Sequence, residues 1–279
     1  MTDSEILRIA RLCTDVVKEH MRWIEDHDRP LVGSPIAQDD LLFTVMSMTE
    51  LVVSPIKGAW DCLYVVCSSL FDLEEVRGIG HAALVRSAIT AATTSLWILD
   101  DDELARRARA LIIARAQCVA ERDFIQGVAP DWHGSNTMIG ALTEHVRQRV
   151  DRVTADGERI GVDAETIAKK PKDSKIVRAG GERIPATVLG GHQPGPYIVS
   201  EWRLLSARAH GFHWPAKYAN EPRRVEHGHY VVLDATIPAE RFLGSVRAAM
   251  VAARVATDRF AAFAGTAPAE ELRKPWELQ

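Results

Sequence analysis

The sequence has few cysteines and no excess of positive charge. Only four of its 279 residues are cysteines, and no two of them form a Cys-x-x-Cys pair. All four lie in apolar segments, so we expect reduced, buried thiols and neither a disulfide framework nor a zinc site. The formal net charge of −4 argues against a protein that coats nucleic acid with its whole surface, although it allows a local basic patch.

Long uncharged apolar runs are also missing. The longest extends from Ser87 to Leu99, which is far shorter than the roughly 20 residues that a membrane-spanning helix needs. The chain opens with Met1-Thr-Asp-Ser-Glu5, without the basic start and apolar run of a signal peptide. These features predict a cytoplasmic protein with no membrane partner.

The common signatures of nucleotide-binding and hydrolytic enzymes are not present either. The sequence contains no Walker-type phosphate loop, no Gly-x-Gly-x-x-Gly fingerprint, no Gly-x-Ser-x-Gly elbow and no His-Glu-x-x-His pair. Their absence weakens the usual nucleotide, hydrolase and zinc-protease hypotheses, and we expect no cofactor.

Apolar residues recur at helical spacing along most of the chain, which predicts an all-α bundle of six or seven helices. Pro55 is expected to kink the second helix or to divide it in two. The third is apolar nearly all round, which places it inside the bundle. The expected helices span about residues 4–27, 38–72, 74–99, 103–126, 131–155, 197–211 and 238–263.

Residues 156–196 differ from the rest in composition, because glycine, proline and lysine cluster there. We expect a long irregular connection with one short helix near residues 163–169. The β-branched centre of residues 223–234 fits one small β-hairpin. The chain is therefore predicted to be a single helical domain over residues 1–264, followed by a loosely ordered tail over residues 265–279.

The residues best suited to chemistry gather between Tyr197 and Pro215. Arg203 and His210 are seven residues apart, close to two helical turns, so both side chains project from one face. Arginine matches the geometry of a phosphate group, and histidine can move protons near neutral pH. Ser206 lies between them, and we take Arg203, His210 and Ser206 as candidate catalytic residues. The same spacing also fits a polar seam in a helical bundle.

A second set of residues could contact phosphates or bases. Two tryptophans flank the Arg203 segment, where they can line a pocket or stack a base, although packing in a core is the simpler explanation. Two arginines share a face of the fourth helix, where an ion-paired, solvated surface is the simpler explanation. The candidate RNA-binding residues are Arg208, Trp202, Trp214, Arg115 and Arg122.

Histidines offer a weaker alternative, a metal site. His210 and His213 are three residues apart, and His227 and His229 are two apart, spacings that can chelate a metal ion. Gly211 breaks the helix between the first two, which disturbs their geometry. We therefore assign no metal ligand and keep these four histidines as an alternative.

The Arg203 and His210 spacing resembles the Arg-x4–6-His motif of the HEPN superfamily, whose members are helical bundles. In outline the chain is also similar to bacterial all-helical proteins that carry an Arg-Leu-Leu-Ser…His-Gly segment late in the sequence. In those proteins an earlier helix is similar to the segment from His81 to Asp100. The resemblance implies metal-independent RNA cleavage at a site shared between two copies of the chain. Arg203 would hold the scissile phosphate and His210 would assist proton transfer.

One position departs from that pattern. HEPN nucleases usually carry a polar residue directly after the arginine, whereas this chain has Leu204. The departure puts catalysis in doubt and leaves the expected scaffold unchanged. Three hypotheses therefore stay open: a HEPN-like ribonuclease in stress or phage defence, a non-catalytic helical interaction or regulatory protein, and a bundle that binds a metal or a small ligand.

Overall fold

The chain folds almost entirely into helices, as a computed structural model shows, and the predicted all-α class is confirmed. The structure describes residues 3–73, 78–128, 136–212, 214–215, 223–227, 230–234, 239–266 and 272. The long helices are α1 (Asp3–Asp26), α3 (Met48–Leu73), α4 (Gly78–Ile98), α5 (Glu103–Val128), α6 (Asn136–Arg159), α9 (Pro194–Ala209) and α10 (Ala239–Ala264). The shorter ones are α2 (Pro35–Asp40), α7 (Ala164–Ala168), α8 (Asp173–Gly181) and the 3-10 turn η1 (Ala186–Leu189). Two strands, β1 (Arg223–His227) and β2 (Tyr230–Asp234), pair antiparallel.

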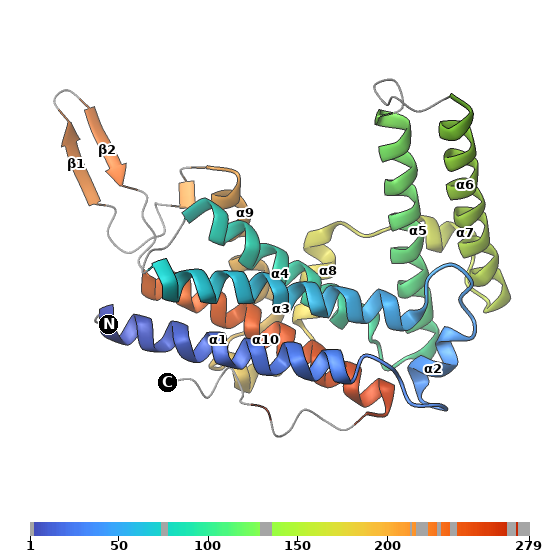
Figure 1. Cartoon of the computed structure of the whole chain (residues 1–279), viewed down its shortest axis with the longest axis horizontal. Coiled ribbons are helices and arrows are strands. Elements are labelled where there is room, and N and C mark those ends of the chain that lie inside the picture. The colour runs from blue at the N-terminus through green and yellow to red at the C-terminus, as the bar shows by residue number, and fades with distance from the viewer. Residues whose placement is uncertain are drawn as a thin grey trace.

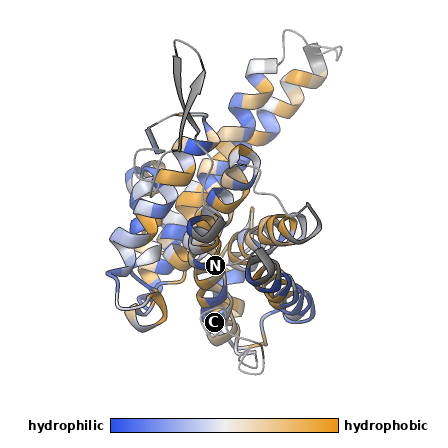
Figure 2. Ribbon diagram, turned by 90° about the vertical axis from the view of Figure 1, so that its left-hand side faces the viewer, coloured by the Kyte–Doolittle hydropathy of each residue, from blue (hydrophilic) through white to orange (hydrophobic). Residues whose placement is uncertain are grey.

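Helices α1, α3, α4 and α10 lie side by side and form the body of the molecule (Figure 1). Helix α4 is central, because it contacts α3, α8, α9 and α10. Its residues Val85, Ile89 and Leu96 are fully buried, as expected for a helix that is apolar nearly all round. Hydrophobic residues gather where the long helices face one another (Figure 2).

Helices α5 and α6 form an antiparallel pair that projects from one end of this body (Figure 1). The first turns of α5 belong to the main core, through residues such as Ala110 and Leu111. Farther along, the two helices contact each other through a small separate cluster of Cys118, Ile125 and Val146. We call the pair α5 and α6 the arm.

The predicted irregular character of residues 156–196 is wrong, whereas the short helix expected near residues 163–169 is present as α7. This segment contains the end of α6, then α7, α8 and η1, and the start of α9. Asp163 caps α7 by accepting a hydrogen bond from the backbone N–H of Thr166, at 2.8 Å. Pro194 lies in the first turn of α9, where backbone N–H groups have no partner within the helix, so the missing N–H of proline costs no hydrogen bond. A Cβ atom on Gly180 would lie 2.1 Å from the carbonyl oxygen of Thr93, so the absence of a side chain there lets α8 approach α4.

The expected division of this helix at Pro55 is also wrong, because Pro55 lies inside the continuous helix α3. The break in this region falls instead between α2 and α3. Helix α3 is held on several sides by α1, α4 and α10, so tertiary contacts outweigh the lost backbone hydrogen bond. The segment Met48–Leu70 is long and apolar enough to cross a membrane by length and composition alone, and half of its residues are buried inside the bundle. The predicted tail over residues 265–279 lies mostly outside the described residues.

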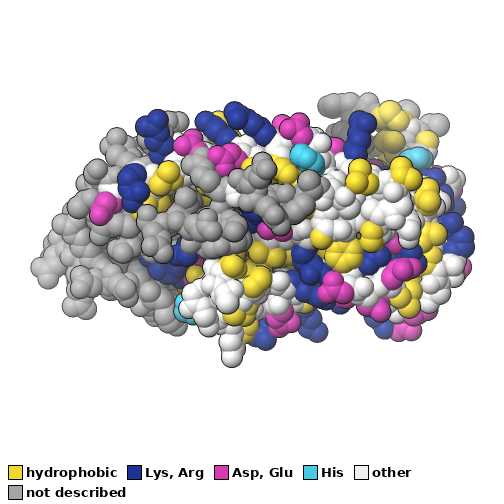
Figure 3. Space-filling view, turned by 90° about the horizontal axis from the view of Figure 1, so that it is seen from below, with side chains coloured by type: hydrophobic (Ala, Val, Ile, Leu, Met, Phe, Trp, Pro, Cys, Tyr) yellow, Lys and Arg dark blue, Asp and Glu magenta, His cyan; other side chains and the backbone are white. Residues whose placement is uncertain are grey.

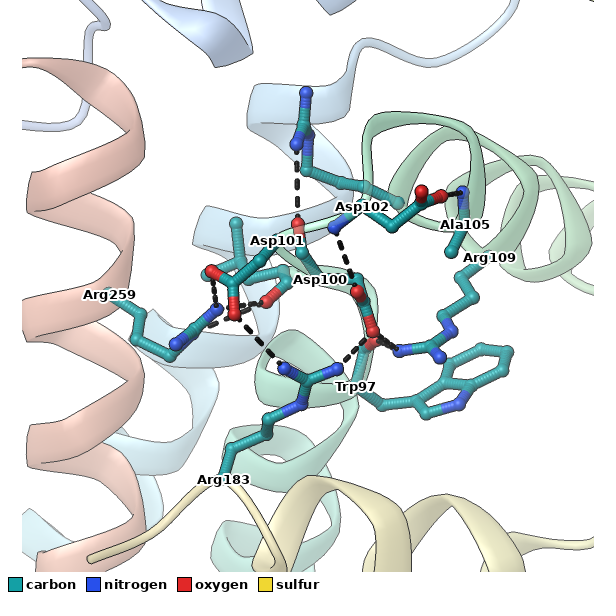
Figure 4. A network of polar contacts seen from close by, with 10 residues as sticks. Trp97, Asp100, Asp101, Asp102, Ala105, Arg109, Arg183 and Arg259 are labelled. Atoms are coloured by element: carbon teal, nitrogen blue, oxygen red, sulfur yellow. Dashed lines mark hydrogen bonds and ion pairs between the residues drawn. The ribbon is translucent and has the colours of Figure 1, made fainter.

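An ion-pair network joins the end of α4 to three other elements (Figure 4). Asp100 accepts a hydrogen bond from the backbone N–H of Asp102 and forms ion pairs with Arg109, at 2.6 Å, and Arg183. Arg183 follows α8 directly, so the network fixes the end of that helix. Burial raises the pKa of Asp100, but the N–H of Asp102 and the two arginines outweigh it, and the net pKa is lowered.

Candidate functional site: an arginine pocket on helix α9

Helix α9 ends where the sequence predicts. Gly211 adopts a left-handed φ of 70°, which a residue without a side chain accepts easily. The backbone N–H of Phe212 reaches back to the carbonyl of Ala207 at 2.9 Å, and the N–H of His210 to that of Ser206 at 3.1 Å. This termination leaves His210 exposed at the last turn of the helix.

Arg203 lies near the middle of α9 and lines a surface pocket of about 440 Å³. The pocket is built by three helices, since Arg178 comes from α8 and Arg241 from α10. Trp214, which is 41% exposed, supplies an aromatic wall. The remaining lining residues are Pro196, Val199, Ser200 and Leu204. We call this the arginine pocket.

Two of the three arginines keep their charge available. Arg178 and Arg203 are both exposed, and neither forms an ion pair or side-chain hydrogen bond with the part of the chain that the structure describes. On the face seen in Figure 3, basic and acidic side chains are interspersed. The arginine pocket is therefore a local concentration of positive charge in a chain whose net charge is −4.

The third arginine is held by a buried carboxylate. Both terminal nitrogens of Arg241 bind Glu201, at 2.6 and 3.0 Å, and the Ser245 hydroxyl donates to the same carboxylate at 2.7 Å. The hydrogen bonds that Arg241 donates to Glu201 raise the pKa of Arg241. Glu201 is 3% exposed, so this fork fixes the guanidinium at the edge of the pocket.

Arg208 lies beside this pair and is half-buried. Its burial lowers the pKa of the guanidinium, and the nearby positive charge of Arg241 lowers it further. Arg208 does not line the arginine pocket, yet it adds positive charge close to Arg241. Of the predicted RNA-binding residues, Arg208 and Trp214 are therefore the two that lie at or next to the pocket.

Of the three candidate catalytic residues, Arg203 lines the arginine pocket, and Ser206 and His210 do not. Arg203 shares its pocket with Pro196 and Ser200, which precede it on α9, whereas His210 lies at the opposite end of the helix. The arginine pocket that Arg203 lines does not include His210. Seven residues of helix separate their Cα atoms by about 10 Å. Ser206 lies between them, and its carbonyl serves the cap at His210.

The other predicted RNA-binding residues lie elsewhere. Trp202 is part of the packing against α4, because its indole N–H donates to Thr90 at 2.9 Å and Arg86 lies over its ring. Arg115 and Arg122 are on α5, and Arg122 pairs with the neighbouring Asp123 at 2.8 Å. None of these three side chains lines the arginine pocket.

Of the four histidines proposed as alternative metal ligands, the structure describes the side chain of only one. His210 is described, whereas His213, His229 and the side chain of His227 lie outside the described residues. Within the described part of the chain, no group of three or more histidine, cysteine, aspartate or glutamate side chains is arranged to hold a metal ion.

Arg178 and Arg241 are the pocket residues that the sequence did not indicate. They come from segments 25 residues before and 38 residues after Arg203, and neither segment carries a recognisable motif. Only the packing of α8 and α10 against α9 brings the three charges together. No family model, curated protein or solved structure matches the chain, so these contacts are the basis on which a function can be inferred.

Proposed function

We propose that this chain is a HEPN-like RNA-binding protein that holds a phosphate of the RNA in the arginine pocket. The observation that carries the proposal is the exposed Arg203 side chain, which shares a concave surface with Arg178, Arg241 and Trp214. Guanidinium groups bind phosphate oxygens through paired hydrogen bonds, and an indole ring can stack a base.

Cleavage of the bound RNA is the second step of the proposal, and it needs His210. In a metal-independent reaction the ribose 2′-hydroxyl attacks phosphorus and loses its proton to a base, while the 5′-oxygen leaves and gains a proton. Arg203 stabilises the charge on the phosphate oxygens, and His210 transfers the protons. Because His210 does not line the arginine pocket of its own chain, we assign the proton transfer to His210 of a second copy.

Complementation between two inactive variants tests this arrangement. Arg203→Ala and His210→Ala should each abolish cleavage of single-stranded RNA in buffer that contains EDTA. When the two variants are mixed and allowed to exchange subunits, one of the two composite sites regains both residues, so activity should return. A site built within one chain stays inactive in the mixture, and that result would exclude the shared site.

A non-catalytic function is the second candidate, and the separation of Arg203 from His210 favours it. In that case the arginine pocket binds RNA as a recognition module. Wild-type protein should then bind single-stranded RNA, lose most of this affinity in Arg203→Ala, keep it in His210→Ala, and leave the RNA uncut. Circular dichroism of each variant establishes that folding is unchanged. Absence of RNA binding by the wild type would reject both candidates.

A further inference from the structure

The charge of the arginine pocket exceeds what one internal RNA phosphate supplies. Arg178, Arg203 and Arg241 bring three positive charges, and Glu201 neutralises one of them through its fork with Arg241. Two net positive charges therefore face the pocket, with Arg208 close by. A phosphodiester inside a strand carries a single negative charge, whereas a phosphate monoester carries about 1.5 to 2 at neutral pH.

The shape of the pocket points to a ligand larger than a phosphate ion. Its volume of about 440 Å³ lies within the range typical of small-molecule sites. Trp214 offers an aromatic surface, and Val199 and Leu204 offer apolar ones, beside the three arginines. A cluster that binds phosphate alone has no use for these surfaces, whereas a nucleobase can stack on an indole ring.

We propose that the arginine pocket recognises a nucleoside 5′-monophosphate group, with the terminal phosphate held by Arg178, Arg203 and Arg241 and the base against Trp214. The group can belong to a free nucleotide or to the phosphorylated 5′ end of an RNA strand. The inference rests on the RNA-binding function proposed above and narrows its non-cleaving form. A terminal phosphate monoester held by Arg203 is not the phosphodiester that the cleavage step would break, so the inference requires a binding site for an end that bears a phosphate monoester.

The geometry also assigns distinct tasks to the three arginines. Arg241 is fixed by Glu201 and provides a rigid corner of the pocket, whereas Arg178 and Arg203 are exposed and can close around the phosphate. Arg178 stands on α8, whose end is anchored to Asp100 through Arg183. Arg178 is therefore the best residue to substitute in a test of phosphate monoester recognition. Its replacement disturbs the fold least and leaves Arg203 and His210 unchanged.

Isothermal titration calorimetry of the full chain with AMP and adenosine provides the test. AMP should bind at least about tenfold more tightly than adenosine, and also more tightly than inorganic phosphate, because the two groups bind together. Arg178→Ala should lower AMP affinity by about tenfold. Lys175→Ala, which removes a positive charge from the same helix outside the pocket, should leave it unchanged. Equal binding of AMP and adenosine, or equal effects of the two substitutions, would overturn the proposal. Binding of inorganic phosphate as tightly as AMP would also overturn the proposal.

RNA oligonucleotides identify the source of the group. If the 5′ end of RNA is the ligand, a 5′-phosphorylated oligonucleotide should bind about tenfold more tightly than its 5′-hydroxyl counterpart, and AMP should compete with it. AMP binding without such a preference would identify a free nucleotide. Arg203-dependent binding of 5′-hydroxyl RNA together with no binding of AMP would reject the monoester and retain the RNA-binding function. Binding of AMP without any RNA binding would retain the monophosphate site and reject the RNA-binding function.

Discussion

The imidazole of His20 accepts a hydrogen bond from the guanidinium of Arg254, with 3.0 Å between the two nitrogens. An arginine cannot accept, and the other ring nitrogen of His20 lies 2.8 Å from the carbonyl oxygen of Val16. These two contacts fix the neutral tautomer with its proton on Nδ1. A second proton would face the N–H of Arg254 inside a buried core.

The stability of the protein should therefore depend on pH. Burial, together with Arg254, lowers the pKa of His20 from 6.5 to about 4. The pKa of His20 is lower in the folded than in the unfolded protein. The contribution of neutral His20 to the free energy of unfolding is therefore complete above pH 6.5 and is lost as the pH falls towards 4. Urea unfolding across this pH range should show that the free energy of unfolding decreases by on the order of 3 kcal/mol. The decrease should be absent in His20→Gln and retained when the exposed His192 is replaced in the same way.

Gly180 should tolerate no side chain. In Gly180→Ala the new Cβ meets the backbone of Thr93, which cannot move aside as a flexible side chain can. We expect a loss of about 3 kcal/mol or more in the free energy of unfolding. The matched control is Gly140→Ala on α6, where a Cβ meets nothing within 4 Å. That substitution should stabilise the protein by up to about 1 kcal/mol, and equal melting temperatures for the two variants would contradict the close packing of α8 on α4.

Glu201→Gln should change stability and ligand binding in opposite directions. The substitution removes the charge that holds Arg241, whose side chain is 38% exposed, so we expect a loss of only about 1 to 2 kcal/mol. The pocket meanwhile gains one net positive charge, which should tighten AMP binding. Calorimetry and thermal unfolding measure the two effects. Glu158→Gln, at an exposed site on α6, should alter neither, and weaker AMP binding by Glu201→Gln would count against Arg241 as a phosphate ligand.

The two neighbouring aspartates of the network in Figure 4 should differ in importance. Asp100 is 8% exposed and pairs with Arg109 and Arg183. Asp100→Asn therefore removes the carboxylate of Arg109 and leaves Arg183 with only its longer contact to the exposed Asp101, at 3.3 Å. We expect a cost of about 3 kcal/mol. Asp101 is 73% exposed at its side chain, and Asp101→Asn should cost less than about 1 kcal/mol. Chemical denaturation of both variants compares them, and similar losses would mean that burial does not control the network.

Helical periodicity predicted much of the fold, since the main helices and the central position of α4 follow from the spacing of apolar residues. The sequence pattern failed where glycine and proline serve close packing. Gly180 looks like a helix breaker along the chain, and only its contact with Thr93 explains its presence inside α8. Pro55 similarly stays within α3 because neighbouring helices hold it there.

The candidate site was predictable only in part. Arg203 and Trp214 stand on the one segment rich in polar and aromatic residues, so composition indicated them. Arg178 and Arg241 reach the pocket through the packing of α8 and α10 on α9, which no local pattern encodes. The motif also suggested that Arg203 and His210 share one face. It did not show that Arg203 lines a pocket with residues of α8 and α10 that does not include His210.

The arm should behave as a separate unit in hydrogen exchange. Val153 joins the last turns of α6 to the main core. Between the first turns of α5 and these last turns of α6, the two helices are held together by the small separate cluster of Cys118, Ile125 and Val146. Segments with few buried apolar contacts open locally at a lower free energy than the rest of a protein. Backbone amides in the second half of α5 and the first half of α6 should therefore exchange with deuterium well before those of α3 and α4, through openings that leave the body and its arginine pocket folded.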